Sequence, residues 1–339
     1  MIQAKEFIGQ NVSGLLLRTI DTNDIAALIA VQKGRQQHDK IDPISTFEDI
    51  PTLDQVTWWV NHKIDSGGLD TVRVAEIDGV VAGYTWLEWW TEVDGVRLFL
   101  SQAALLPQWR NRGIGSAMLH WAETRLRMEA ASQTETGPAF FGANATETEA
   151  DDTRLLLDAG YVRTFSVLEM ERDHLDNAVQ TPLPDGLTLR PLQEEDFLYV
   201  GRSVTECYNE SAFGVSPSAD EEQRKIEWLK GFDPSICFVV WDGDEVAGQI
   251  ICRIDKGRGE AAEVSVRAPW RRRGLAKALL TTAFCAFRER GLTVARLHTV
   301  AENRYGSVKL YQSAGFRIIK DHLRYRKPMH LGDSPASNG

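Results

Sequence analysis

The stretch Val266-Arg267-Ala268-Pro269-Trp270-Arg271-Arg272-Arg273-Gly274-Leu275-Ala276-Lys277-Ala278-Leu279-Leu280 joins three local patterns. An apolar run that ends at Val266 predicts a buried strand. Apolar residues at helical spacing after Gly274 predict a helix, and a short basic loop separates the two elements. The unpaired N–H groups and the positive dipole end of the first helical turn would face this loop. The sequence therefore predicts a binding site for an anion such as a phosphate.

The pattern occurs a second time, as Leu105-Leu106-Pro107-Gln108-Trp109-Arg110-Asn111-Arg112-Gly113-Ile114-Gly115. In both copies a tryptophan lies four residues before the loop glycine. Three further pairs of segments match in the same order along the chain: residues 17–20 with 189–192, 75–83 with 240–248, and 155–161 with 310–316. Four matches in one order indicate a tandem duplication.

The loop fits neither a Walker A sequence nor Gly-x-Gly-x-x-Gly. It fits Arg/Gln-x-x-Gly-x-Gly/Ala and resembles the pyrophosphate-binding motif of the GNAT superfamily of acyl-CoA-dependent N-acyltransferases. The resemblance covers nearly all of the chain. It implies an α/β fold with α+β mixed sheets, in which two tandem modules each have a mostly antiparallel central sheet flanked by helices. It also implies acetyl-CoA as cosubstrate, without a metal.

The expected division places an N-terminal module at residues 1–172 and a C-terminal module at residues 187–330. Residues 173–186 contain two prolines among polar neighbours and are expected to be the linker between them. The polar tail, residues 331–339, is expected to be disordered.

Composition favours a cytoplasmic protein. The 339 residues include 38 Lys and Arg against 48 Asp and Glu, a net charge of −10, which disfavours a nucleic-acid partner and suits a positively charged amine substrate. We expect no membrane segment, because no run of about 18 apolar residues occurs, and no signal peptide. The four cysteines are scattered, which predicts free thiols. Both a monomer and a homodimer are compatible with the sequence.

The resemblance places the coenzyme contacts in the two loops and one later asparagine. In the second copy these residues are Val266, Arg271, Arg272, Arg273, Gly274, Leu275, Ala276 and Asn303, and in the first copy they are Arg110, Asn111, Arg112, Gly113, Ile114 and Gly115. The backbone N–H of Val266 would face the thioester oxygen. Asn303 would contact the pantetheine or the diverging strands, or serve only as a turn or helix-cap residue.

Acyl transfer to an amine requires a proton for the departing thiolate. The family usually supplies it from a tyrosine in a motif that this chain contains as Asn303-x-x-x-Ser307-x-x-Leu310-Tyr311-x-x-x-Gly315-Phe316. Tyr311 is therefore the expected general acid, with a core-packing role as the alternative. The first copy has Leu156 at the position of Tyr311 and Thr148 at that of Asn303. The first module is thus expected to be non-catalytic, either a structural half or an extra coenzyme site, a plan similar to that of the mycothiol synthases.

The general base is less sharply defined by the sequence. Glu263, on the strand before the loop, and His298, on the neighbouring strand, are both candidates. A glutamate paired with an arginine and a hydrogen-bonded strand histidine are the structural alternatives, and ordered water can also carry the proton.

The polar segments at residues 33–54 and 209–220 are expected to border the acceptor site. Trp58 and Trp59 lie in a predicted helix at residues 56–64, where core packing is favoured over ligand stacking. The leading functional hypothesis is N-acetylation of a small-molecule amine by the second module. The alternatives are acylation of a protein or peptide N-terminus and a non-enzymatic acyl-CoA sensor.

Overall fold

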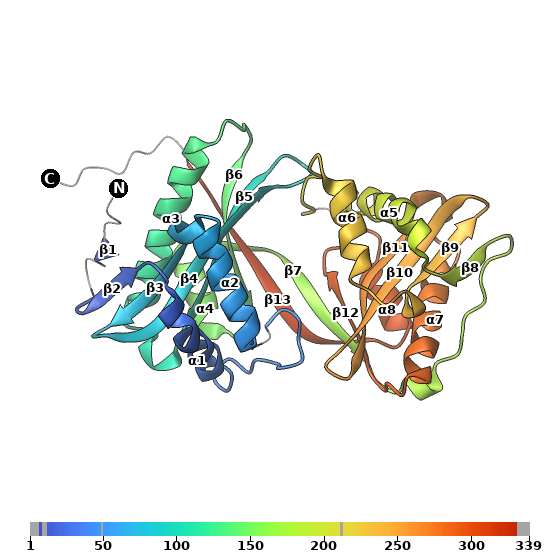
Figure 1. The fold of residues 1–339 in the computed structure, drawn as a ribbon, viewed down its shortest axis with the longest axis horizontal. Coiled ribbons are helices and arrows are strands. Elements are labelled where there is room, and N and C mark those ends of the chain that lie inside the picture. Colours follow the sequence, from blue (N-terminus) through green and yellow to red (C-terminus); the bar gives the residue numbers. More distant parts are fainter. Residues whose placement is uncertain (1–6, 9–11, 49, 211–212, 331–339) are drawn as a thin grey trace. The chain divides into compact units, whose positions relative to one another are not determined.

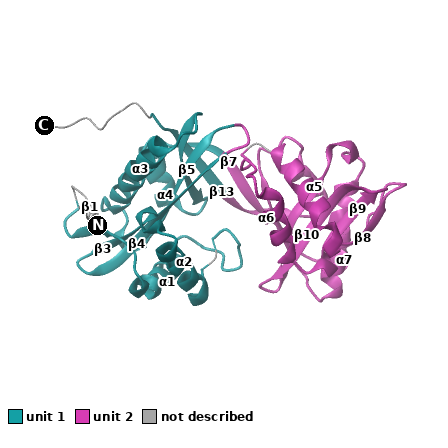
Figure 2. Ribbon diagram, turned by 45° about the horizontal axis from the view of Figure 1, so that its top comes forward, with its two compact units in different colours: residues 1–91, 95–164, 322–339 teal, residues 92–94, 165–321 magenta. Residues whose placement is uncertain are grey.

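The computed structural model describes residues 7–8, 12–48, 50–210 and 213–330, so the tail at residues 331–339 lies outside the described residues. The chain forms two compact units (Figure 2). Unit 1 comprises residues up to 91, residues 95–164 and those from 322 onward, and unit 2 comprises residues 92–94 and 165–321. Each unit is a mixed sheet with helices on both faces, which confirms the predicted fold class (Figure 1).

The sheet of unit 1 has the strand order β1, β2, β3, β4, β5, β6, β13. Its strands are β1 (Phe7–Ile8), β2 (Leu15–Arg18), β3 (Val72–Ile77), β4 (Val80–Thr91), β5 (Arg97–Leu105), β6 (Ala139–Thr146) and β13 (Arg317–Pro328). Its helices are α1 (Ile25–Arg35), α2 (Leu53–Asp65), α3 (Ile114–Ser132) and α4 (Ala150–Asp158). Among the described strands of unit 1, β5 and β6 pair in parallel and the other neighbouring strands pair antiparallel.

Two apolar clusters hold unit 1 together, one on each face of its sheet. Helices α1 and α2 bury Val31 and Val60 on one face, against Val74 of β3. Helix α3 buries Met118 on the other face, against Phe141 of β6. Alternating residues of a strand point to opposite faces, so the central strands contribute to both clusters.

The sheet of unit 2 has the order β7, β12, β11, β10, β9, β8. Its strands are β7 (Val162–Arg172), β8 (Thr188–Pro191), β9 (Phe238–Asp242), β10 (Glu245–Asp255), β11 (Arg258–Val266) and β12 (Ala295–Val300). Its helices are α5 (Phe197–Asn209), α6 (Glu221–Lys230), α7 (Leu275–Glu289) and α8 (Ser307–Ser313). Helix α7 packs deeply against the sheet, with Leu279, Ala283 and Phe287 almost fully buried.

The two units exchange the last strand of each sequence copy, β7 and β13. In unit 1 the last strand of the chain, β13, pairs antiparallel with β6, from His322 opposite Thr146 to Pro328 opposite Phe140. In unit 2 the strand that follows α4, β7, pairs antiparallel with β12. Both strands follow matching helix ends, Gly160 and Gly315, in the duplicated sequence. The duplication gave β7 and β13 equivalent sequence patterns. Each strand can therefore take the position beside β6 or β12 that the other would hold if each copy kept its own last strand.

The exchange makes the compact units differ from the expected modules. Residues 165–172 belong to unit 2, and the described residues from 322 onward belong to unit 1. The expected linker, residues 173–186, consequently joins β7 to β8 inside unit 2. It is also partly packed, since Leu175 and Ala178 are buried in the core of that unit.

Each unit contains two parallel strands that separate along their length. In unit 2, β11 and β12 pair only from Gly259–Ala261 to Ala295–Leu297, and the later residues of β11 have no partner strand on that side. In unit 1, β5 and β6 pair from Arg97 to Ser101 only. The two loops predicted to bind an anion follow directly after β5 and β11, where these strands have separated from their parallel neighbours. Of the helices within the described residues, none is long and apolar enough to cross a membrane.

Candidate active site

The basic loop of unit 2 has the predicted strand–loop–helix geometry. A short 3-10 turn, Ala268–Trp270, leads out of β11, and the Trp270 indole N–H donates to the Asp242 carboxylate at 2.8 Å. Gly274 begins α7 with a φ of +85°, a left-handed conformation that favours glycine. A Cβ atom there would meet nothing within 4 Å, so the N-terminus of α7 faces open space. The open, uncapped helix end fits an anion.

The three loop arginines differ in their surroundings. Arg271 turns back and donates its Nε–H to the carbonyl oxygen of Val266 at 2.8 Å. Its Nη1 pairs with Glu210 at 2.6 Å, and its guanidinium lies 4.5 Å from the ring centroid of Tyr305. Arg272 and Arg273 are exposed. Arg271 therefore braces the loop, whereas the guanidiniums of Arg272 and Arg273 are left exposed to solvent.

The direction of the Val266 N–H follows from the pairing of β11 with β10. The Arg267 N–H donates to the Ala247 carbonyl at 3.1 Å, and Val266 lies opposite Gly248. In an antiparallel ladder, hydrogen-bonded and non-hydrogen-bonded pairs alternate. The N–H of Val266 is therefore directed away from β10, toward the side from which β12 has diverged.

The diverging strands open into a cavity of about 430 Å³ that contains all three predicted catalytic residues. Tyr311, Glu263 and His298 line it, and so do Asn303 and the loop residues Val266, Arg271, Arg272, Gly274, Leu275 and Ala276. Arg273 does not line it. The predicted acid, both predicted bases and most of the predicted coenzyme contacts thus share one cavity.

Glu263 is a buried carboxylate inside this cavity. It accepts a hydrogen bond from the Ser265 hydroxyl and interacts with the phenol of Tyr208. Burial raises the pKa of Glu263 above its ordinary value, and the neighbouring hydroxyls partly offset that effect. A carboxylate with a raised pKa is a better general base near neutral pH than an exposed one.

Tyr311 is buried on α8, with its ring 6.0 Å from that of Phe316. Burial, together with the negative charge of Glu263, raises the pKa of Tyr311 above the ordinary tyrosine value. The phenol therefore stays protonated at neutral pH. Tyr311 can donate a proton inside the cavity, as the general acid must.

His298 and Asn303 take part in other contacts as well. The imidazole of His298 lies between Glu169 at 3.7 Å and Glu260 at 3.9 Å. The side-chain Oδ1 of Asn303 accepts a hydrogen bond from the backbone N–H of Tyr305 at 2.8 Å, which is the turn role considered as the alternative. Its amide nitrogen is not involved in that bond, and the residue still lines the cavity.

A β-bulge marks β11 next to the cavity. Ile251 lies opposite Glu263, but the following residue, Cys252, lies opposite Ala261, so Ala262 is the extra residue. A bulge bends the strand and redirects the side chains beyond it. The corresponding pair in unit 1, β4 with β5, keeps one unbroken register from Gly83 opposite Leu105 to Thr91 opposite Arg97. Glu263 therefore follows a local distortion that the first copy lacks over this stretch.

The loop of unit 1 has a closely similar backbone, but acidic residues surround it. Asn111 and Gly113 have left-handed φ angles of +58° and +82°, close to the +60° and +85° of Arg272 and Gly274. Arg110 braces this loop through the Leu105 carbonyl at 3.1 Å, as Arg271 braces the other.

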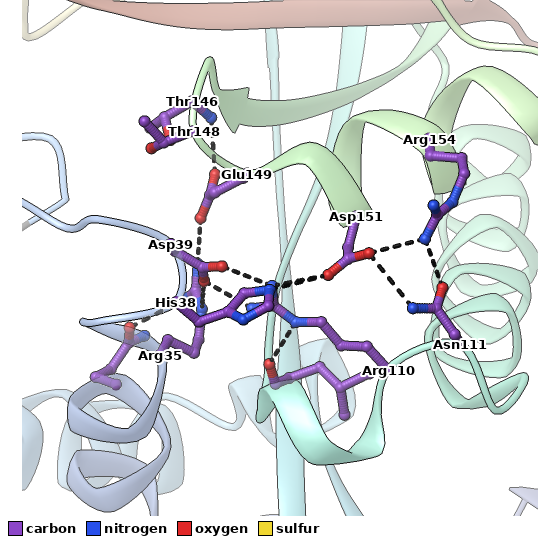
Figure 3. A network of polar contacts seen from close by, with 12 residues as sticks. Arg35, His38, Asp39, Arg110, Asn111, Thr146, Thr148, Glu149, Asp151 and Arg154 are labelled. Carbon is purple, nitrogen blue, oxygen red and sulfur yellow. Dashed lines mark hydrogen bonds and ion pairs between the residues drawn. The ribbon is translucent and has the colours of Figure 1, made fainter.

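The side chains of the unit 1 loop are held in a polar network (Figure 3). Both Nη atoms of Arg110 lie 2.6 Å from the carboxylate oxygens of Asp39. Asn111 contacts Asp151 and accepts a bond from Arg154 at 2.6 Å. The predicted coenzyme contacts Arg110 and Asn111 are therefore already engaged by neighbouring side chains.

Unit 1 also differs at the helix that faces its loop. Glu149, Asp151 and Asp152 line the 220 Å³ pocket there, where aligned unit 2 positions hold Arg304, Gly306 and Ser307. Burial and the charge of Glu149 raise the pKa of Asp152 to about 6.

The position equivalent to Tyr311 is apolar in unit 1. Leu156 is buried there, so this position offers no phenol. The pocket therefore combines several carboxylates with a leucine at the place that Tyr311 occupies in unit 2.

The cavity lining of unit 2 also includes polar residues that the sequence analysis did not name as site residues, among them Tyr208, Cys207 and Ser265. Tyr208 and Cys207 lie at the end of α5, more than 50 positions before Glu263 in the sequence. The charge of Glu263, together with burial, raises the pKa of Tyr208 above its ordinary value. In the sequence, the one feature that could have pointed to Cys207 and Tyr208 is their position just before the polar segment expected to border the acceptor site.

Comparison with known proteins settles the family. Residues 36–137 and 202–316 each match the family described as Acetyltransferase (GNAT) family. The chain belongs to this family. It is therefore an N-acetyltransferase of the GNAT type, a family that uses acetyl-CoA as the acyl donor, and the two matches correspond to the two copies of the duplication.

Known proteins align with this GNAT protein over most of its length. The mycothiol acetyltransferase of Geodermatophilus obscurus is 26% identical over 317 residues, covering 89% of this chain and 94% of the relative. A GCN5-related N-acetyltransferase from Sphaerobacter thermophilus superposes with a TM-score of 0.72 at 20% identity, over 93% of this chain and 96% of that one. A tandem GNAT protein from the clavulanic acid biosynthesis pathway gives 0.63 at 13% identity, over 94% and 99%. These structures establish the tandem fold.

Proposed function

We propose that unit 2 transfers the acetyl group of acetyl-CoA directly to the primary amine of a small molecule. One observation carries the proposal: the cavity of unit 2 holds an open helix N-terminus, a buried tyrosine and a buried carboxylate together. An anchored coenzyme, a proton donor and a proton acceptor are what direct acyl transfer requires. The relationship to mycothiol acetyltransferases supports a small-molecule acceptor.

Each group has one task in the reaction. The N-terminus of α7, with Arg272, holds the pyrophosphate, and the Val266 N–H polarises the thioester carbonyl. Glu263, directly or through water, accepts the proton that the amine loses as its nitrogen bonds to the carbonyl carbon. Tyr311 gives its proton to the sulfur as the carbon–sulfur bond breaks. His298, held between two carboxylates, is the alternative base.

Unit 1 serves as a non-catalytic partner module in this proposal, so the chain has one coenzyme site. Leu156 in place of a tyrosine supports the absence of turnover. The carboxylates of Glu149, Asp151 and Asp152 support the absence of pyrophosphate binding, because like charges in a confined pocket repel.

The test is a turnover assay with purified full-length protein, acetyl-CoA and a panel of small primary amines, with a peptide bearing a free N-terminus for comparison. We expect acetylated small amine, identified by mass spectrometry, in amounts that match the release of free CoA. Turnover of the peptide alone would favour the protein-acylating alternative. Binding of acetyl-CoA with no turnover of any acceptor would favour the sensor.

A further inference from the structure

A second large cavity lies in unit 1, separate from the cavity of unit 2. It has a volume of about 830 Å³ and is bordered by α2, by β4 and by the segment that precedes α2. A volume of this size suits a small molecule, since such sites span about 300–1,000 Å³. We call this cavity the aromatic pocket, because Trp59, Tyr84 and Trp86 line it.

The side-chain rings of these three residues lie next to one another and form what we call the aromatic corner. Tyr84 and Trp86 are two residues apart on β4 and therefore project from the same face of the strand. Their rings lie 5.5 Å apart with an angle of 23° between the planes. The ring of Trp59, from α2, lies 6.3 Å from Trp86 at 76°. The hydroxyl of Tyr84 is held by Gln32 at 2.6 Å, which fixes the ring in place.

The charges that line the aromatic pocket favour a cation. Three carboxylates line it, those of Glu48, Asp54 and Glu149. Two guanidiniums also line it. Arg35 is bound to Asp39 and to Glu149, so the charge of Glu149 is already paired. The other, Arg324, lies over the ring of Phe47 at 5.6 Å.

Asp54 is the carboxylate best placed to meet a ligand from solvent. It is exposed in the first turn of α2, on the helix that also carries Trp59. Negative charge beside aromatic faces is the chemistry that binds organic ammonium ions, because the ring quadrupole and the carboxylate both attract the cation.

We propose that the aromatic pocket of unit 1 binds a small organic ammonium ion that carries an apolar or aromatic group. The aromatic corner takes the cationic head and its apolar substituent, and Asp54 attracts the charge at the entrance. This site does not depend on catalysis by unit 2, so it stands or falls separately from the proposed transferase reaction.

The test uses titration calorimetry on the full-length protein without acetyl-CoA. The probe is phenethylammonium, and its neutral counterpart is 2-phenylethanol. We expect saturable binding of the ammonium at least about tenfold tighter than that of the alcohol, which corresponds to about 1.4 kcal/mol. Equal affinity for the two probes, or no saturable binding of the ammonium, would overturn the proposal.

Variants then locate the binding site. We expect Trp86→Leu to weaken ammonium binding about tenfold or more. Asp54→Lys should also weaken it by about tenfold, and because Asp54 is exposed this second variant keeps the test independent of any folding defect in the first. Asp65→Lys, at the exposed far end of α2, is the matched control and should leave binding unchanged.

A variant of unit 2 separates the two cavities. Glu263→Gln alters the cavity of unit 2 alone, so ammonium binding in the aromatic pocket should be retained in it. Retained affinity in both Trp86→Leu and Asp54→Lys, with loss in Glu263→Gln, would instead place the ammonium in the cavity of unit 2 and refute the site in unit 1.

Discussion

Arg271 donates its Nε–H to the carbonyl oxygen of Val266, 2.8 Å away, and so closes the base of the loop that leads into α7. Unit 1 repeats the bond between Arg110 and Leu105. The first arginine of the motif, expected from the sequence to contact the coenzyme, is thus a brace in both copies. The bond ties the guanidinium to the end of the strand that precedes each loop.

Because Arg271 makes this loop bond and Arg272 is exposed, substitution of each should have a different effect. Arg271→Ala should lower the free energy of unfolding by about 1–2 kcal/mol, because it breaks the loop bond and leaves Glu210 without its cation. Arg272→Ala should leave the free energy of unfolding unchanged, but weaken acetyl-CoA binding and reduce its salt dependence. Urea unfolding and calorimetry at two salt concentrations measure both. Unchanged stability of Arg271→Ala would show that the bond is not a brace.

Tyr311→Phe should lower kcat by about 10²-fold or more while leaving the KM for acetyl-CoA nearly unchanged, because only proton donation is lost. Tyr199→Phe is the matched control, since Tyr199 is an exposed tyrosine elsewhere in unit 2. Steady-state kinetics of both variants with one amine give the answer. Full activity of Tyr311→Phe would remove this residue from the mechanism.

The pH dependence of kcat/KM should report Glu263. Because burial raises its pKa, activity should rise with pH through a limb that lies above the ordinary glutamate range of about 4.3. A base works only when deprotonated, so activity is lost as the pH falls through this pKa. In Glu263→Gln the limb should disappear and the rate should fall. Persistence of the same limb in that variant would assign the titration to His298 or another group.

The two loop glycines should respond differently to the same substitution. Gly274→Glu places a charged side chain at the open N-terminus of α7 and in a strained backbone conformation, so it should abolish acetyl-CoA binding. Gly113→Glu, the matched change in unit 1, should leave binding in unit 2 intact. Calorimetry should show one site per wild-type chain. Two sites, one lost in each variant, would contradict the proposal that unit 1 has no coenzyme site.

Asp152 should make the stability of unit 1 dependent on pH. Its pKa of about 6 exceeds the unfolded value of 3.8, so its unfavourable contribution is complete above pH 6 and vanishes as the pH falls toward 3.8. Its surroundings include Glu149, Asp39 and the two arginines Arg35 and Arg110. Asp152→Asn should therefore stabilise the protein by about 1–3 kcal/mol at pH 8, and by less at pH 5.

Denaturant unfolding at the two pH values checks this effect, with Asp158→Asn on the same helix as control. An equal effect of Asp152→Asn at pH 5 and pH 8 would show that the carboxyl does not titrate between them.

Local patterns predicted the parts of the fold that depend on local sequence. The loop glycines, the helix that follows Gly274 and the presence of two related copies were all predicted, because turn conformation and helical periodicity depend on residues that are close together in the sequence. Tyr311, Glu263 and His298, the three candidates for proton transfer, line one cavity.

Long-range features escaped sequence analysis. Strand exchange could not be predicted, since β7 and β13 have equivalent patterns and only the finished sheets show which partner each takes. The expectation that Trp58 is a core residue was wrong: its side chain is 67% exposed and stacks on His62. The network of Asp39 with Arg110 joins residues 71 positions apart, beyond any periodic signal.

The exchange of strands also sets an order in which the protein can be completed during synthesis. Unit 2 consists of residues 92–94 and 165–321, all of which precede the segment of β13 that pairs with β6. A nascent chain can therefore finish unit 2 while β6 in unit 1 still presents an open edge, which is a hazard for aggregation. The half of the protein that is translated first is the half that closes last. A chain truncated before His322 should consequently leave unit 1 incomplete, however much of that unit's own N-terminal sequence is present.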